Sequence, residues 1–359
     1  MGNNNFKKKI LLHDIQYSNG GPKTVLYGIV NSYLAEKYDF ARLPQTARCG
    51  FNLLKAIKFI IHYKRLIDAE KADVIYVCGL QYTGLLMTIA GKLSNVKKVV
   101  LSVHGSDWDN PDGTLRKWLL MNIVEPLEVR LADSVFTVCQ AAQQTIGALK
   151  SASAGCNAGV VYNTFPNINY AEVNQGKLRR ELDIPANKIV VTSVGRVVKA
   201  KGHDYAIKAI KAIRDTDFVF VVVGDGPYTE VYKKELENEI SEKRVFVLGS
   251  RSDVNEILKD SDIFLFSTLN ENHSLALMEA VNMHCACIAT NVGGNPEIIK
   301  NGESGILIPK MDSDAIVKAL YRLKEKEIRE TYSKKAFYDC SRRFSIENTY
   351  GKLDKIFSK

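Results

Sequence analysis

The residues best suited to hold a charged, hydroxylated ligand lie in the second half of the chain. Arg196 ends the apolar run KIVVTSVGR at 188–196, and Lys201 and Gly202 follow in the next loop, before a helical pattern. Two cations on one loop at the end of a strand suit a diphosphate, because a guanidinium group bridges two oxygens while an ammonium group acts as a point charge. The alternative, a solvated basic loop, fits this pattern equally well when it is taken alone.

Two carboxylates follow in the segment TLNENHSLALMEAV at 268–281, where Glu271 and Glu279 are eight residues apart and Ser274 is placed to cap a helix. At ~1.5 Å of rise per residue they lie roughly 12 Å apart, beyond the ~5–9.5 Å of paired glycosidase carboxyl groups. We therefore expect two separate anchors on one long ligand, with sugar hydroxyls at one end and ribose hydroxyls at the other. A solvated helix face is the alternative for either glutamate alone.

Two features of the first half also follow expected strands. Gly20 and Gly21 lie between the first apolar run and a helical pattern, where backbone amides can approach a phosphate. A plain strand-to-helix turn explains them as well. His104 ends the run KKVVLSVHG at 97–105, where its ring can donate to a ligand oxygen. A structural histidine is the commoner outcome for such a residue.

A DxD pattern, which holds a metal-bound diphosphate in some sugar-transfer enzymes, occurs at 107–109. The same pattern recurs at 215–217 and 312–314, so it has little specificity. We therefore assign no metal.

The elements that must position these residues alternate between short apolar runs and longer helical patterns. Strands are expected at 8–15, 73–80, 97–105, 134–140, 188–196, 218–226, 244–250, 262–268 and 285–294. Helices are expected at 23–37, 52–70, 83–94, 112–131, 203–214, 228–242, 252–260, 274–283 and 312–326. This alternation predicts parallel sheets in two doubly wound domains, whose ligands bind beyond the carboxyl ends of the strands. The polar stretch at 160–177 marks the break between them.

Composition excludes several classes of protein. The 359 residues are 46% hydrophobic and 25% charged, which rules out a disordered chain, a fibre and a small disulfide scaffold. The net charge of +9 is uneven: residues 1–165 carry 19 basic against 12 acidic groups, a net +7, and the remainder carries 30 against 28, a net +2. A basic first half indicates nucleic acid, an anionic membrane or a phosphorylated ligand. No nucleic-acid-binding motif supports the first of these.

The expected location is cytoplasmic. The seven scattered cysteines include no CxxC pair, so we expect reduced thiols. The first apolar stretch is too short for a signal peptide, and Phe6 breaks the N-myristoylation pattern. No apolar run approaches the ~18 residues of a membrane span.

The segment 52–67 is a candidate membrane-surface helix. At ~100° per residue Lys55, Lys58, His62 and Arg65 fall within about 80° of one another beside a broad apolar face, and Phe51 precedes them. Such helices lie on anionic membranes. An ordinary domain helix with a solvated polar face is the alternative.

Taken together, these segments resemble the family 4 retaining glycosyltransferases of the GT-B fold. The resemblance covers nearly the whole chain and is strongest from 188 to 310. It rests on six ordered segments: SVGRVVKAKGHDYAIKA, VVVGDGP, VFVLGSRSDV, DIFLFSTLNENHSLALMEA with its two glutamates, IATNVGGNPEII and NGESGILIP. It implies two facing Rossmann-like domains with an interdomain cleft. The acceptor-side domain would span 1–165 with a returning C-terminal helix at about 342–359, and the nucleotide-sugar-binding domain 166–341.

The resemblance also implies roles for single residues. Arg196 and Lys201 would bind the donor diphosphate and stabilise the leaving nucleotide, with Gly20 and Gly21 on the same phosphates. Glu271 would hold the donor sugar, and Glu279 the ribose. The remaining donor-site assignments are His104 at the donor sugar or the side of the departing phosphate, Gly249 and Arg251 around the base, and the backbone of Asn272, His273, Ser274 and Leu275 at phosphate or sugar. Family members often have Glu-Gly-Phe-Gly at 271–274, so Asn272 and His273 bear on sugar preference.

The function that this resemblance implies is sugar transfer with retention and without a metal. The donor would be a nucleotide sugar, with a UDP-sugar favoured and a GDP-sugar as the alternative. The acceptor would be a lipid-linked saccharide or an oligosaccharide in bacterial polysaccharide or lipopolysaccharide assembly. The protein would lie on the inner face of the cytoplasmic membrane, with Lys55, Lys58, His62, Arg65 and Phe51 toward the membrane or acceptor. The alternatives are a nucleotide-sugar epimerase or another enzyme of the same fold, and a non-catalytic basic protein that binds a membrane surface.

Overall fold

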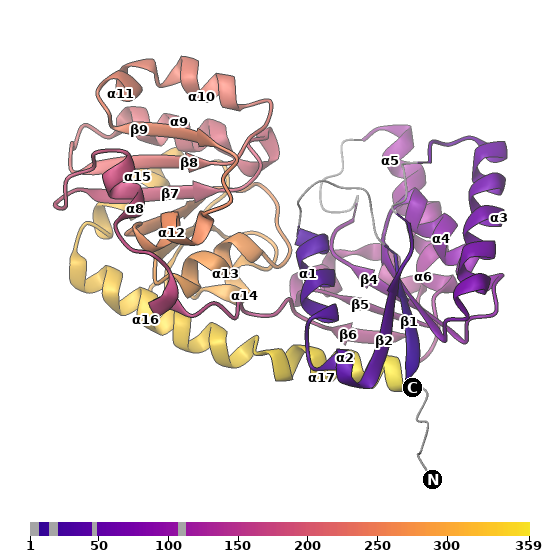
Figure 1. Ribbon diagram of the computed structural model, residues 1–359. Helices are drawn as coiled ribbons and strands as arrows, with labels where there is room; N and C mark the ends of the chain where they lie inside the picture. The colour runs from indigo at the N-terminus through magenta and orange to yellow at the C-terminus, as the bar shows by residue number, and fades with distance from the viewer. Residues whose placement is uncertain (1–6, 14–20, 45–48, 107–112) are drawn as a thin grey trace, which may run out of the picture. The chain divides into compact units, whose positions relative to one another are not determined.

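The computed structural model describes residues 7–13, 21–44, 49–106 and 113–359. By its internal contacts the chain divides into two compact units (Figure 1). The N-terminal unit comprises Met1–Thr164 and Ile346–Lys359, and the C-terminal unit comprises Phe165–Ser345. Each unit has its own sheet and its own core.

The sheet of the N-terminal unit has six parallel strands in the order β2-β1-β3-β4-β5-β6. The strands are β1 Lys8–Leu12, β2 Tyr38–Arg42, β3 Val74–Gly79, β4 Lys98–Val103, β5 Ser134–Thr137 and β6 Asn157–Val160. Strand order reverses between β1 and β3, so the loops after these strands diverge there. Such a switch point leaves a crevice at the carboxyl edge of a sheet.

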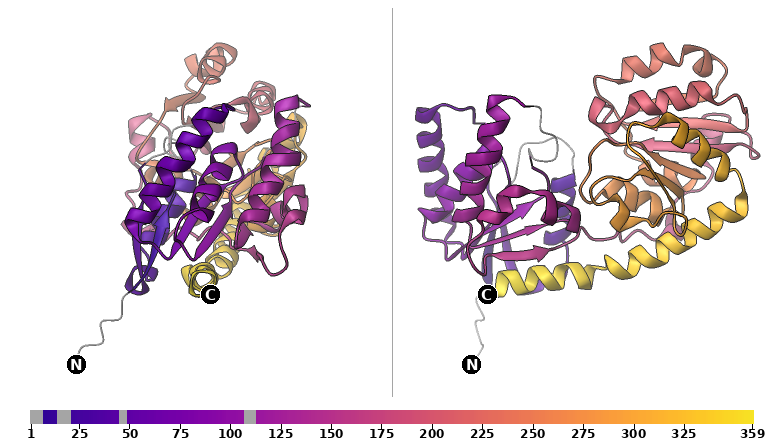
Figure 2. Two further views of the ribbon diagram at one scale, coloured as in Figure 1. Left: turned by 90° about the vertical axis from the view of Figure 1, so that its right-hand side faces the viewer. Right: turned by 180° about the vertical axis from the view of Figure 1, so that it is seen from behind.

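Helices cover both faces of this sheet (Figures 1 and 2). Ile10 and Leu12 of β1 pack in one core with α1 (Gly21–Val30), α2 (Leu34–Lys37) and α17 (Ile346–Ser358). Leu11 points to the opposite core, because side chains alternate along a strand. That core is shared with α3 (Leu53–Glu70), α4 (Tyr82–Lys92), α6 (Glu125–Leu131) and α7 (Gln140–Thr145).

The sheet of the C-terminal unit has the order β12-β11-β10-β7-β8-β9, again parallel throughout. Its strands are β7 Ile189–Val194, β8 Phe218–Val223, β9 Val245–Gly249, β10 Ile263–Phe266, β11 Ala286–Thr290 and β12 Ile306–Ile308. This is the order of a dinucleotide-binding Rossmann sheet, with its switch point between β7 and β10. The two sheets confirm the predicted doubly wound α/β class.

The helices of the C-terminal unit also form two layers. One core joins the sheet to α9 (His203–Ala212), α10 (Thr229–Glu235) and α15 (Ser313–Arg322). The other joins it to α8 (Lys177–Glu181) and α12 (Val254–Lys259). The remaining helices are α11 (Glu237–Ser241), α13 (Leu275–Asn282), α14 (Asn295–Ile298) and α16 (Lys326–Arg343).

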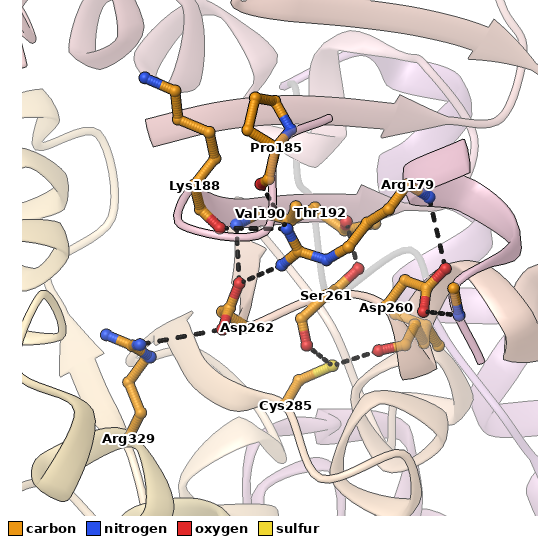
Figure 3. A network of polar contacts seen from close by, with 12 residues as sticks. Arg179, Pro185, Lys188, Val190, Thr192, Asp260, Ser261, Asp262, Cys285 and Arg329 are labelled. Atoms are coloured by element: carbon orange, nitrogen blue, oxygen red, sulfur yellow. Dashed lines mark hydrogen bonds and ion pairs between the residues drawn. The ribbon is translucent and has the colours of Figure 1, made fainter. Parts of the chain in front are cut away.

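A polar network holds the amino edge of this second sheet (Figure 3). Asp262, immediately before β10, accepts hydrogen bonds from the Val190 amide of β7 and from Arg179 of α8, both at 2.9 Å. Arg329 of α16 lies 3.8 Å from its other oxygen. Asp260 accepts from the amides of Gly176 and Leu178 at the start of α8. These bonds bind two central strands and two helices together at the edge away from the loops that follow the strands.

The structure departs from the predicted elements mainly at sheet edges. Strands β2, β6 and β12 were not expected, and each lies at an edge of its sheet. An edge strand is paired on one side only, so its sequence can be short or polar, as in YDFAR and NAGV. The predicted helix at 23–37 was wrong in extent, because α1 ends at Val30 and the chain enters β2 at Tyr38.

Two other helices also differ from expectation. The pattern at 112–131 forms α5 (Leu115–Leu119), a π-helical turn at Leu120–Val124 and α6. The pattern at the C-terminus divides between α16, which ends at Arg343, and α17, which begins at Ile346. The seven cysteines are free thiols, as expected.

Candidate functional site

The carboxyl edge of the C-terminal sheet carries a pocket at its switch point. The pocket lies beyond β7 and β10, where the loops after the two strands diverge, and it includes both predicted cations. It is lined by Ser193, Val194, Gly195, Arg196, Lys201, His203, Val222, Val223, Leu265, Phe266 and Ser267. The structure therefore places Arg196 and Lys201 together in one concavity, at the position where Rossmann sheets bind ligands.

Lys201 and Glu271 form an ion pair at the mouth of this region. Lys201 Nζ lies 2.5 Å from Glu271 Oε2, and both side chains are half-buried. The lysine ammonium group also lies 5.0 Å from the centroid of the Phe266 ring. Sequence reasoning assigned Lys201 and Glu271 to different parts of a ligand, and the structure adds that they touch each other.

One glycine lies beside each residue of the ion pair: Gly202 follows Lys201 in the chain, and Gly293 lies against the backbone of Glu271. Gly202 has φ +70, and a Cβ there would collide with the Ser267 carbonyl oxygen. Gly293 has φ +50, and a Cβ there would collide with the Glu271 carbonyl oxygen. Both positions therefore require glycine for conformational and steric reasons. The loop after β7 and the turn at 292–294 are thus built to approach the backbone of their neighbours closely.

Helix α13 begins at Leu275, so Glu271 lies in the loop before the helix. The Ser274 side chain accepts a hydrogen bond from the Leu277 amide at 3.2 Å, which confirms the predicted cap. Asn272 and Ser274 are buried, and Leu275 is half-buried. His273 is buried with its ring 4.6 Å from that of Phe344, and burial lowers its pKa to about 3. The His273 ring is therefore a neutral core group rather than a side chain on the open edge.

Glu279 lies within α13, about one turn after the first residue of the helix, whereas Glu271 precedes the helix. Burial raises the pKa of this carboxyl group to about 7. Burial penalises the charged form of this half-buried group, and hydroxyl donors from a ligand would stabilise that charged form. The ionisation of Glu279 is thus sensitive to whatever binds beside it.

Gly249 and Arg251, the residues predicted to surround the nucleotide base, lie at the end of β9 and two residues after it. Gly249 closes the strand, has φ +68, and accepts a hydrogen bond from the Gly224 amide at 2.7 Å. The Arg251 guanidinium group binds Glu181 through two hydrogen bonds of 2.6 and 2.8 Å, and it also binds Asp253. Arg251 therefore joins α8 to the segment before α12, and its donors are engaged by protein carboxylates.

Sequence reasoning missed three polar groups of this pocket. Ser193 donates to the Leu265 carbonyl at 2.6 Å and so joins β7 to β10. Ser267 donates to the carbonyl oxygens of Lys201 and Gly202, which fixes the basic loop. His203 lies 3.0 Å from the Tyr232 hydroxyl and 3.2 Å from the Arg196 carbonyl. Their position one or two residues from a strand end or from Lys201 was the available signal.

In the N-terminal unit, His104 follows β4 and lines a separate pocket bounded by α1 and α17. Burial lowers the His104 pKa to about 4, so its ring is neutral at physiological pH. Its Nε2 lies 2.9 Å from Ser102 Oγ, and Ser102 in turn is hydrogen-bonded to the buried Tyr76 hydroxyl. Gly21 begins α1 and is exposed. Gly20 and the DxD pattern at 107–109 lie outside the described residues.

The predicted membrane-surface residues are on α3 or just before it. Lys55, Lys58, His62 and Arg65 are exposed, and the exposed Phe51 ring stacks against Tyr82 with centroids 4.4 Å apart. Within the residues that the structure describes, no cluster of three or more His, Cys, Asp or Glu side chains could hold a metal ion. Nor does any helix in those ranges have the length and apolar character needed to cross a membrane.

The fold and the switch-point pocket define a protein of two Rossmann-like units, in which Arg196 and Lys201 line a concavity at the carboxyl edge of the second sheet. Comparison with known families agrees. Residues 174–338 match the family described as glycosyl transferases group 1, and residues 30–128 match glycosyl transferase 4-like. Between them these matches cover most of the chain. The protein belongs to the group 1 and family 4-type glycosyltransferases of the GT-B fold.

Individual relatives extend along nearly the whole chain. An Escherichia coli UDP-Gal:α-D-GlcNAc-diphosphoundecaprenol α-1,3-galactosyltransferase is 29% identical over 339 residues, covering 92% of this chain and 86% of its own. Anabaena Alr3699/HepE in complex with UDP and glucose superposes with a TM-score of 0.79 at 19% identity, covering 98% and 100% of the two chains. Sucrose-phosphate synthase from Thermosynechococcus elongatus gives 0.80 at 15% identity, covering 98% of both. These two solved structures show the likeness of fold.

Proposed function

We propose that the protein transfers a sugar, with retention, from a nucleotide-diphosphate sugar to a lipid-linked saccharide in bacterial polysaccharide assembly. A UDP-sugar is the favoured donor. The observation that carries this proposal is the Lys201–Glu271 ion pair beside Arg196 at the switch point, with Glu279 about one turn into α13, the helix that follows Glu271. The E. coli relative, whose name states a UDP-sugar donor and a diphosphoundecaprenol acceptor, supports both choices of substrate.

The donor diphosphate is assigned to the loop after β7. As the nucleotide departs, negative charge develops on its phosphates, and preorganised cations stabilise such charge more in the transition state than in the ground state. Arg196 and Lys201 supply these cations. Gly20, Gly21 and the backbone of residues 272–275 supply amide donors. These groups together replace a metal in neutralising the leaving group.

The hydroxyl groups of the donor are assigned to the two carboxylates. Glu271 accepts from hydroxyls of the transferred sugar and so holds the reacting carbon near the acceptor. Glu279 accepts from the ribose, Gly249 and Arg251 frame the base, and His104 contacts the donor sugar as a neutral ring. Each carboxylate is a binding group in this scheme, and neither acts as a nucleophile.

The acceptor is assigned to the N-terminal unit, and α3 holds that unit on the cytoplasmic face of an anionic membrane. Lys55, Lys58, His62 and Arg65 project from α3 into solvent, where they can reach anionic headgroups. This location brings the enzyme to an acceptor that is confined to the bilayer, which is consistent with the acceptor in the E. coli relative's name.

The test is a panel of nucleotide sugars incubated with membrane acceptor and scored by nucleotide release. Release that requires acceptor, and that Glu271→Ala and Lys201→Ala both abolish, supports the proposal. Conversion of the donor without acceptor would instead identify an epimerase. Vesicle binding without any nucleotide-sugar binding would identify a non-catalytic membrane protein.

A further inference from the structure

Exposed apolar side chains are concentrated on one end of the N-terminal unit. Of the fifteen large hydrophobic residues that are exposed within the described ranges, nine lie on α3 with its preceding residue or on α5–α6. The nine are Phe51, Leu53, Leu54, Ile57, Ile61, Leu115, Trp118, Ile123 and Leu127. A concentration of this kind marks an interaction surface more often than scattered single residues do. We call these nine residues the apolar end.

The outward face of α3 is not an ordinary solvated face. Ala56, Tyr63 and Ile67 pack into the core of the unit, which fixes the opposite side of the helix as its outer side. Leu54, which is 71% exposed, and Ile61 lie on that outer side, interleaved with Lys58 and Arg65. A helix that needed only to be soluble would carry polar groups there.

Helix α5 presents a second apolar tip. Thr114 caps the helix, Leu115 is 73% exposed, and Trp118 is 54% exposed one turn later, with the exposed Arg116 between them. The sequence pattern predicts a single helix at 112–131 and does not distinguish Leu115 and Trp118 from the rest of it. Tryptophan beside a basic residue at an exposed helix tip suits the boundary between headgroups and acyl chains.

Within residues 49–67 and 113–131, the charged side chains that reach solvent have one sign. Residues 49–67 contain no acidic group, and the two acidic groups of 113–131, Glu125 and Glu128, are fully buried. Burial and the charge of Glu125 raise the Glu128 pKa well above its usual range, which favours its neutral form. The charged side chains of these two segments that contact water are therefore lysines and arginines.

The two helices are joined through α4. Phe51, before α3, stacks against Tyr82, the first residue of α4. Tyr82 packs in turn against the buried cluster of Leu85, Leu120 and Val124, which belongs to α4 and the π-helical turn after α5. The starts of α3 and α5 thus flank the start of α4, and the figures show both helices rising at the same end of the unit (Figures 1 and 2).

We propose that α5 is a second membrane-docking element, which inserts Leu115 and Trp118 into an anionic bilayer while α3 supplies charge and a second row of apolar groups. The proposal deepens the membrane location stated under the proposed function by naming the inserting residues. An anionic bilayer fits the joint presence of exposed apolar tips and of exposed lysines and arginines on the same two segments, since insertion and headgroup attraction act together.

Trp118 provides its own probe, because the chain contains only two tryptophans, Trp108 and Trp118. The full-length Trp108→Phe protein is mixed with vesicles of phosphatidylglycerol and phosphatidylcholine, or of phosphatidylcholine alone, without acceptor or nucleotide. We expect the Trp118 emission to shift to shorter wavelength with anionic vesicles only. We also expect added salt to reverse the shift. An unshifted emission with anionic vesicles would overturn the proposal.

Substitutions distinguish the contribution of apolar insertion to vesicle binding from that of basic charge. Leu115→Ser with Trp118→Ser should lower vesicle binding by at least about tenfold, through loss of inserted apolar surface. Arg116→Gln should lower it about fivefold. The matched control is Leu93→Ser, because Leu93 is 58% exposed at the other end of α4. Vesicle binding unchanged by the double substitution, or equally reduced by the control, contradicts the assignment.

Two further measurements test whether a second copy of the chain covers the apolar end, and whether the double substitution affects transfer only through membrane binding. Sedimentation that shows a dimer broken by the double substitution would mean that a second copy of the chain covers the apolar end, and would overturn the proposal. Transfer to a detergent-free, water-soluble acceptor should be unaffected by the double substitution, whereas transfer to a bilayer acceptor should fall. Since the vesicle measurements contain no sugar, they stand even if the transfer reaction proves to be a different one.

Discussion

Lys201 Nζ and Glu271 Oε2 lie 2.5 Å apart, so the lysine proposed to bind the diphosphate is already neutralised by the glutamate proposed to hold the sugar. A ligand that brings two negative phosphates would compete with Glu271 for the three donors of the Lys201 ammonium group. To the extent that Lys201 turns to the phosphates, the Glu271 carboxylate becomes available to sugar hydroxyls. On the proposed assignment, the pair would couple the two halves of donor recognition.

This coupling predicts opposite effects on binding and on transfer. Glu271→Gln should bind free UDP at least as tightly as the unaltered protein, because the competing carboxylate is removed. Its transfer rate should fall about 10- to 100-fold, because a charged hydrogen-bond acceptor is lost. Lys201→Ala should weaken UDP binding by a similar factor. Calorimetric titration with UDP and a nucleotide-release assay measure the two quantities.

The control for this experiment lies two residues away. Lys199 is exposed on the same loop, so Lys199→Ala removes an equal charge from nearly the same place. It should change neither quantity by more than about twofold, as is usual for exposed charges. A loss of UDP binding equal to that of Lys201→Ala would mean that the loop attracts phosphate by net charge alone.

The raised pKa of Glu279 leads us to expect that donor binding strengthens as pH rises. Its pKa of about 7 leaves the carboxyl group mostly neutral at pH 6 and mostly ionised at pH 8. The ionised form accepts hydrogen bonds from ribose hydroxyls more strongly than the neutral form does, so donor affinity should increase by up to about tenfold between these values. The diphosphate of a nucleotide sugar does not titrate in this range. Titrations of a nucleotide sugar at a series of pH values measure the slope.

The matched variant is Glu279→Gln, which keeps the size of the side chain and removes its ionisation. Donor binding by this variant should be independent of pH between 6 and 8 and weaker than that of the unaltered protein at pH 8. A slope that survives the substitution would assign the titration to another group.

Ser102 is predicted to position His104. The serine hydroxyl lies between the Tyr76 hydroxyl and Nε2 of a neutral imidazole, so it selects one tautomer of the ring. Ser102→Ala should lower turnover about fivefold, the effect of one neutral hydrogen bond, with little change in KM. Ser102→Thr should restore it. Ring ¹⁵N chemical shifts of His104 report the tautomer, and shifts unchanged by Ser102→Ala would contradict this role.

Asp262 is predicted to stabilise the C-terminal unit without affecting its chemistry. Asp262→Asn weakens its bonds to Arg179 and Arg329 at the amino edge of the sheet, and should cost about 2 kcal/mol in the free energy of unfolding. Urea denaturation measures this value. Asp339→Asn is the control, since Asp339 makes no ion pair within the described part of the chain. Equal losses in the two variants would exclude a specific role for the network.

The sequence predicted the central strands and the charged ends of the site, but not the contacts between them. Buried parallel strands such as β7, β8 and β10 can be predicted because they are continuous apolar runs. Strands β2, β6 and β12 are paired on one side only and need no such pattern. Glu271 and Lys201 were found by type and position. Their ion pair was not, because 70 residues separate them in the chain. The burial of His273 against Phe344 likewise depends on a segment far along the sequence.

The network around Asp260 and Asp262 gives this protein a scaffold that is fastened at the edge opposite its ligands. Changes in the loops after β7 and β10 therefore leave those bonds intact, whereas the segment after β9 itself holds α8 through Arg251 and Asp253. On the proposed donor assignment, a library confined to residues 196–201 and 271–275 offers a practical route to altered donor preference, because these residues lie at the edge of the sheet that the network does not hold.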